Sequence, residues 1–187
     1  MLVRTLSRVA VLLYLCGGLF ASSPSGIWLD VPFVKQEKNG CGAASIAMIL
    51  QYWQREQGHA ARATAEQIQQ TLYSSKAHGI YASDLERYLD QSGYRTFAFR
   101  GQWSDLKDHL EKGRPLIVAL KPPRQAEFHY VVVTGLNWAQ DVVLTNDPAE
   151  RKLFKRERLD FEKQWKAAGS WTLLAVPRQQ NGSSSSY

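Results

Sequence analysis

The 187-residue chain contains only two cysteines, Cys16 and Cys41. Neither belongs to a paired-cysteine pattern of the kind that binds zinc, and the histidines are scattered, so we expect no metal site. The sequence also lacks a phosphate-binding glycine loop and internal repeats, which argues against a P-loop nucleotide-binding domain and a solenoid. It therefore predicts a single globular domain that works without a metal or cofactor.

No apolar run is long enough to span a bilayer comfortably, but residues 1–21 have the pattern of a secretory signal. Two arginines precede an apolar stretch that ends in small residues, and we expect cleavage after Ala21. Leu15 is larger than the small residue that usually precedes a lipidated cysteine, which argues against a lipoprotein site at Cys16. We therefore expect a periplasmic or secreted protein with no transmembrane span after signal removal.

The chain has little excess charge. Its formal net charge of +6 falls to +4 when the two arginines of the leader are removed. Its densest basic cluster, residues 151–158, is interrupted by Leu153, Phe154 and Glu157, and the alternation indicates the solvated face of a strand. Because no nucleic-acid-binding motif accompanies this charge, we expect no nucleic-acid partner.

Helix signals come first along the chain and strand signals later. Capping-box spacing joins Thr64 to Gln67 and Ser83 to Glu86, and a third helix is expected from Ser104 to Gly113. Strand-like runs cover residues 94–99, 116–120, 128–136, 141–146, 152–156 and 171–176. Their close spacing favours antiparallel pairing. The sequence therefore predicts an α+β domain over residues 27–177, with a helical half packed on a sheet, and a disordered tail over 178–187.

Cys41 is the first candidate for catalysis. Gly40 and Gly42 flank it at the start of an apolar segment that continues to Trp53, which we expect to form a central, buried helix. The positive end of a helix favours a thiolate over a thiol, and its free N–H groups can bind an oxyanion. The alternative is a buried cysteine that acts as a small hydrophobic residue.

His129 opens an apolar strand, and Asp147 ends the next one before a proline. A short turn separates the two strands, so they should form a hairpin. If Asn137 pairs with Asp141, Asp147 lies opposite Val131 and diagonal to His129 on the same face. A slip of one residue would turn the acid to the other face. Taken singly, the two residues could equally be a core histidine and a turn aspartate.

Cysteine, histidine and aspartate together suit nucleophilic catalysis. The thiolate attacks a carbonyl, the imidazole moves the proton, and the carboxylate orients the ring. Gln36 lies five positions before Cys41, where its side-chain amide could join the Cys41 backbone N–H in binding the oxyanion. The alternative for Gln36 is an exposed loop residue.

These residues make the chain resemble the bacteriocin-processing cysteine peptidases, papain-like domains that remove double-glycine leaders at exporters. The resemblance runs from Val31 to Pro177 and includes His78–Ile80, Gly113–Val118, and Phe161 with Trp165. It implies a papain-like fold, with Cys41 as nucleophile, His129 as general base and then acid, Asp147 as the orienting acid and Gln36 as oxyanion donor.

The chain departs from the exporter-linked members in two ways. Gly40 precedes Cys41 where those members have an acid, and one residue fewer separates Gln36 from Cys41. The sequence also lacks an ATP-binding loop, so we expect a free-standing, exported peptidase that cleaves a peptide or small protein during its maturation. The substrate could itself be exported, and a secretion system is a candidate partner. Alternatives are a non-catalytic peptide-binding domain on the same fold, or a papain-like acyl transferase or amidase.

Overall fold

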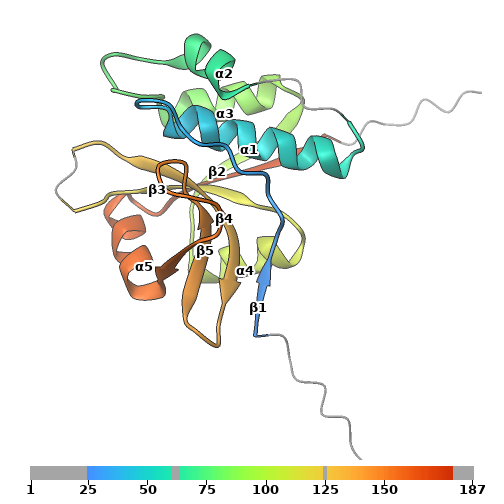
Figure 1. Cartoon of the computed structure of the whole chain (residues 1–187), viewed down its shortest axis with the longest axis vertical. Coiled ribbons are helices and arrows are strands. Elements are labelled where there is room, and N and C mark those ends of the chain that lie inside the picture. Colours follow the sequence, from blue (N-terminus) through green and yellow to red (C-terminus); the bar gives the residue numbers. More distant parts are fainter. Residues whose placement is uncertain (1–24, 60–63, 124–125, 179–187) are drawn as a thin grey trace, which may run out of the picture.

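The computed structural model describes residues 25–59, 64–123 and 126–178 (Figure 1). The predicted signal peptide, residues 1–21, and residues 179–187 of the predicted tail lie outside these ranges. Arg178, the first residue of that tail, donates its backbone N–H to the carbonyl of Gly93 at 3.2 Å. Within the described ranges, no helix has the length and apolar character needed to cross a membrane.

The described residues form a mixed α+β domain, as the sequence predicts. The helices are α1 (Cys41–Glu56), α2 (Ala65–Leu72), α3 (Ala82–Gln91), α4 (Trp103–Glu111) and α5 (Arg158–Ala167). The strands are β1 (Gly26–Trp28), β2 (Tyr94–Arg100), β3 (Leu116–Leu120), β4 (His129–Asn137), β5 (Val142–Asn146), β6 (Phe154–Glu157) and β7 (Trp171–Pro177).

The strands form one antiparallel sheet in the order β2-β7-β3-β4-β5-β6, and β1 pairs with the end of β4. Helices cover both faces of this sheet: α1, α2 and α3 lie on one side, and α4 and α5 on the other (Figure 1). Alternate residues of β3 accordingly enter different cores. Ile117 packs with α1, whereas Leu116 and Val118 pack with α4 and α5. The sheet is therefore buried on both faces around its centre.

Helix α1 is central and buried, as predicted. Its residues from Gly42 to Leu50 are all buried, because apolar and small side chains surround the whole circumference of its first turns. Gly40 precedes the helix as N-cap. A Cβ atom at Gly40 would lie 2.4 Å from Oε1 of Gln69 in α2, so glycine allows the start of α1 to approach its neighbour closely.

The predicted helix caps are partly wrong. Thr64 caps α2 as expected, and its hydroxyl accepts the N–H of Gln67 at 3.3 Å. Ser83 and Ser104, in contrast, lie inside the first turns of α3 and α4. The backbone is still extended at Tyr81 and Gln102, and these residues are the N-caps. Both helices therefore begin before the serine that the capping pattern singled out.

The β4–β5 hairpin contains a register shift that bears on the predicted site. Asn137 pairs with Val142, one residue beyond the predicted partner, so the predicted register is wrong at the turn. A β-bulge at Thr134 then shifts the pairing by one residue. Beyond the bulge, Val132 lies opposite Asn146, which is the register expected from the sequence. Asp147, which follows the end of β5, therefore lies on the same face of the hairpin as His129, as the sequence predicts.

Candidate active site

Cys41 is the first residue of α1, and its side chain is partly exposed as a free thiol. The first N–H groups of a helix have no partner inside the helix, so they and the helix dipole favour negative charge at this point. Asn39, two residues earlier, adopts a left-handed conformation with φ +57°, which asparagine tolerates better than most residues. The loop thus turns directly into the helix and presents the thiol at its positive end.

His129 and Asp147 are in direct contact. Nε2 of His129 donates to Oδ1 of Asp147 at 2.7 Å, and the same oxygen accepts the backbone N–H of Ala149 at 3.0 Å. The Asp147 side chain is only 2% exposed and that of His129 15%. Asn146, in contrast, donates to the carbonyl of Val31 at 3.0 Å, which holds the segment after β1 against the end of β5. Asn146, the last residue of β5, and Asp147, which follows it, thus have different partners, as predicted.

The ring of His129 also has Cys41 as a hydrogen-bond partner. Because Nε2 is used by Asp147, Nδ1 is the nitrogen left for the thiol. Burial alone would lower the pKa of His129, but hydrogen bonds to Asp147 and Cys41 outweigh it and raise the pKa to about 9. Burial would raise the pKa of Asp147, but His129 and Arg156 outweigh it and lower the pKa. The pair therefore stays charged at neutral pH.

Arg156 is a residue of this site that the sequence interpretation missed. Its guanidinium donates to Oδ2 of Asp147, and its side chain is only 13% exposed. The assignment of this basic cluster to a solvated face is therefore wrong for Arg156, although the neighbouring Lys155 is exposed. The alternation of this segment did contain a signal for Arg156. Arg156 and Phe154 share the inward face of β6, and Phe154 pairs with Thr145, two residues before the acid.

Gln36 lies beside these residues. Its backbone N–H donates to the carbonyl of Pro148 at 3.0 Å, which ties the loop before α1 to the residue after the acid. Its side-chain Oε1 is buried without a hydrogen-bond partner among the described residues. Gln36 also lines the small cleft of about 280 Å³ that contains Cys41 and His129. The structure thus brings all four predicted residues to one place.

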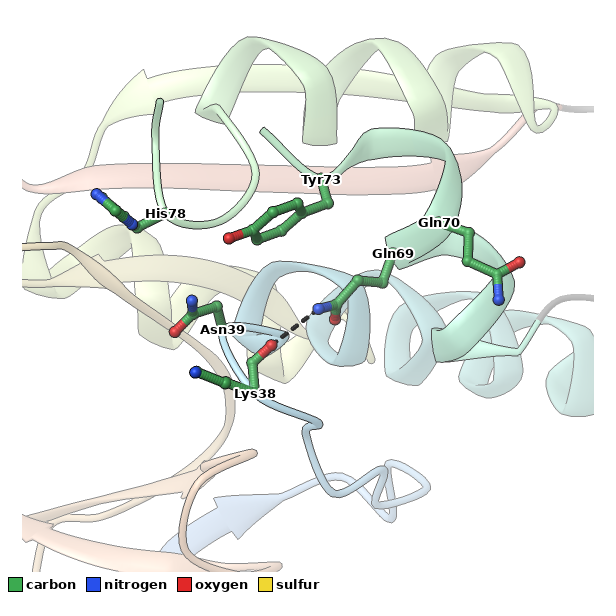
Figure 2. A pocket seen from close by; sticks show the side chains of 6 residues that line it. All are labelled: Lys38, Asn39, Gln69, Gln70, Tyr73 and His78. Carbon is green, nitrogen blue, oxygen red and sulfur yellow. Dashed lines mark hydrogen bonds between the residues drawn. The ribbon is translucent and has the colours of Figure 1, made fainter. Parts of the chain in front are cut away.

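The cleft continues into further hollows. One of about 340 Å³ is lined by Gln36, His129, Asp147, Arg156 and Gln164 among others. Another, of about 680 Å³, lies between α2 and the loop before α1 (Figure 2). In Figure 2, Gln69 and Tyr73 project toward this loop, and Gln69 donates to the carbonyl of Lys38 at 2.9 Å. His78 and Asn39 line both this hollow and the cleft.

Residues 28–172 match the sequence model of the Peptidase_C39 like family. No curated protein matches the chain. Solved structures with the same fold include a protein from Bacillus anthracis described as a C39-like peptidase, with a TM-score of 0.67 at 18% identity. The match covers 83% of this chain and 99% of that one.

Two further similar structures come from transporters. One is a double-glycine-motif protease from an AMS/PCAT transporter, solved with its leader peptide; it has a TM-score of 0.64 at 24% identity and covers 81% of this chain and 94% of that one. The other is the peptidase domain of Streptococcus ComA, a bifunctional ABC transporter involved in quorum sensing, with a TM-score of 0.61 at 17% identity over 79% and 98% of the two chains. The fold is therefore the papain-like fold of C39 peptidases.

Proposed function

Because the chain belongs to the Peptidase_C39 like family, it is a cysteine peptidase, and we propose that Cys41, His129 and Asp147 are its catalytic triad. We propose further that it is exported and cleaves a peptide or small protein during maturation of that substrate. One observation carries the assignment of the triad: the imidazole of His129 is hydrogen-bonded to Asp147 at 2.7 Å and lines the same cleft as Cys41, with which it interacts.

In this mechanism His129 holds a proton at rest, and the reacting form of Cys41 is the thiolate. The sulfur of Cys41 attacks the carbonyl carbon of the substrate, and the electron pair of the carbonyl moves to oxygen. His129 then gives its proton to the leaving nitrogen, and the C–N bond breaks. Neutral His129 next takes a proton from water, whose oxygen attacks the thioester carbon; the C–S bond then breaks, which releases the acid product and restores the thiolate beside protonated His129. The raised pKa of His129 supports this cycle, because the proton is held where the leaving amine needs it.

The oxyanion is stabilised by the backbone N–H of Cys41 and the side-chain amide of Gln36. The position of Cys41 at the start of α1 supports the first donor, since that N–H has no partner within the helix. The place of Gln36 in the lining of the same cleft supports the second. Such donors act on charge that appears only during the reaction, so they lower the barrier rather than strengthen substrate binding.

The proposal of export rests on the signal pattern of residues 1–21. An exported peptide is then a candidate substrate, and a secretion system is a candidate partner. The leader peptide bound to the transporter-derived relative supports a peptide as the ligand. Export is tested by recovering the protein from the periplasm or medium and sequencing its N-terminus, which should begin at Ser22. Recovery only from the cytoplasm with Met1 retained would contradict it.

Peptidase activity is tested by incubating the purified protein with an equimolar mixture of synthetic tetradecapeptides and identifying products by mass spectrometry. The wild type should cleave a subset, and Cys41→Ala should cleave none while keeping its melting temperature. Binding without cleavage by both proteins would favour the non-catalytic alternative. Products that carry an added amine in place of water would indicate acyl transfer. The natural substrate is then sought among exported peptides whose processing depends on Cys41.

A further inference from the structure

A further pocket, of about 420 Å³, opens beside Cys41 and differs in character from the hollows described above. It lies between the segment from Lys76 to Ala82 and the segment from Ala126 to Tyr130. Most of its lining is apolar: Ala77, Ile80, Tyr81, Ala82, Phe128 and Tyr130. Because Cys41 itself lines this pocket, whatever fills it lies next to the reacting sulfur.

The floor and the walls of this apolar pocket have different exposures. Ile80 and Tyr130 are only 5% and 6% exposed, so they form a sealed floor that belongs to the protein core. Tyr81 and Phe128 are 43% and 52% exposed. Tyr81 directly precedes α3, and Phe128 directly precedes β4. Exposed aromatic rings that line a hollow beside a nucleophile are typical of a binding site for an apolar group.

The neighbouring hollows are polar. Gln36, Asn39, His78, Glu127 and His129 surround the cleft over Cys41, and Phe128 is the one large apolar residue that this cleft shares with the apolar pocket. The hollow shown in Figure 2 is lined by amides, a lysine, a histidine and a tyrosine. Apolar side chains are therefore concentrated on one side of the sulfur. An extended peptide that crosses Cys41 would place its polar backbone in the cleft and one side chain in the apolar pocket.

We propose that the apolar pocket binds a large apolar side chain, such as leucine or phenylalanine, of a substrate residue within two positions of the cleaved bond. This inference rests on the proposed function and adds the class of substrate to it. A pair of glycines would leave the pocket unfilled and forfeit the burial of that side chain. The lost contact should lower kcat/KM by about 10- to 100-fold relative to the apolar substrate.

The test uses the same peptide mixture with the full-length protein, and the residues flanking each cleaved bond are counted. Leucine, phenylalanine or tyrosine should be enriched at one position within two residues of that bond. Synthetic peptides that differ only at this position then give kcat/KM for phenylalanine, alanine and glycine. We expect a decrease in this order, with about 10-fold or more between phenylalanine and glycine.

Two variants change the pocket itself. Ala82→Phe fills it and should reverse the order, so that the alanine peptide becomes better than the phenylalanine peptide. Ala98→Phe adds the same ring to an exposed position of β2 and should leave the order unchanged. Phe128→Ala removes one wall and should reduce the preference for phenylalanine, whereas Phe97→Ala removes an equally exposed ring from β2 and should not.

The outcomes separate this inference from the proposed function. Cleavage with a preference for paired glycines, or with no apolar preference, would overturn the inference while the peptidase assignment stands. If Ala82→Phe and Phe128→Ala both leave an apolar preference unchanged, another surface binds the side chain and the inference is wrong. Absence of cleavage by the wild-type protein would contradict the proposed function and the inference together.

Discussion

Arg156 binds the oxygen of Asp147 that His129 does not use. His129 donates to Oδ1 and the guanidinium of Arg156 donates to Oδ2, so the nearly buried carboxylate has a charged partner at each oxygen. This arrangement fixes the rotation of the carboxylate and keeps it ionised. It gives Arg156 a role in positioning the acid that in turn positions the imidazole.

Replacing Arg156 with glutamine should therefore weaken catalysis and shift its pH dependence. Without the guanidinium, the pKa of Asp147 rises, so the acid limb of the kcat/KM profile should move to higher pH. At neutral pH we expect a loss of about 10-fold in kcat/KM, and about 3 kcal/mol in the free energy of unfolding, because a buried ion pair is broken. The measurements are pH–rate profiles and urea titrations.

Arg151→Gln is the matched control. Arg151 lies over the ring of Phe154, with its guanidinium carbon 5.2 Å from the ring centroid. It is exposed, and its guanidinium has no ion pair among the described residues. Replacing Arg151 should change neither the pH dependence of kcat/KM nor the free energy of unfolding. Arg156→Lys should recover part of the acid limb, since it restores a charge without the planar fork. If the pH–rate profile of Arg156→Gln is the same as that of the wild type, Arg156 has a structural role and does not position the acid for catalysis.

The contact between His129 and Cys41 predicts an unusually reactive thiol. Iodoacetamide should alkylate Cys41 at pH 7 faster than it alkylates free cysteine, and His129→Ala should slow the reaction by about 10-fold or more, because the imidazolium that stabilises the thiolate is lost. Alkylation is followed by intact-protein mass spectrometry. Equal rates in the two proteins would mean that the ring and the sulfur do not act as a pair.

Stability should fall on the alkaline side through His129. A folded-state pKa of about 9, raised from 6.5, means that the folded protein binds this proton more tightly than the unfolded chain does. The contribution is complete below pH 6.5 and is lost as pH rises through 9, and it amounts to about 3 kcal/mol. Urea unfolding of the wild type between pH 6 and 10 should show this loss. His129→Gln should lack it, and an identical slope in the variant would count against the assignment.

Gln36→Ala should lower kcat with little change in KM. Its amide is proposed to bind the oxyanion, which exists only during the reaction, so a loss of about 100-fold in kcat is expected. Alkylation of Cys41 should keep its wild-type rate, because iodoacetamide forms no oxyanion. A variant whose kcat is unchanged would leave the backbone N–H of Cys41 as the oxyanion donor supported by the structure.

The sequence places Cys41, His129 and Asp147 through simple patterns. A glycine-flanked cysteine before an apolar run predicts a helix start, and two short strands predict a hairpin. The hairpin register is less secure, because the turn pairs Asn137 with Val142 and only the bulge at Thr134 returns the acid to its predicted face. No local sequence pattern predicts that bulge. The catalytic roles of these residues remain predictions for the experiments above.

Other elements gave weaker signals. Helix α5 was not predicted, because Phe161 and Trp165 are the main apolar residues that it buries in an otherwise polar segment. Strand β1 has three residues and depends on Gly135 for its pairing with β4: a Cβ atom there would lie 2.5 Å from the carbonyl oxygen of Ile27. Arg156 was missed because its partner, Asp147, follows a different strand and the alternating segment was assigned to a solvated face. Each of these features is fixed by tertiary contact rather than by local pattern.

The hydrogen bond from Gln36 to Pro148 joins the beginning of the domain to its last third. In the proposed triad the nucleophile comes early in the chain and the acid comes late, so a polypeptide that is still being synthesised would lack a complete site. We therefore expect proteolysis only after residues up to Arg156 have been synthesised and folded. The compartment in which folding is completed would then also be the compartment in which cleavage starts.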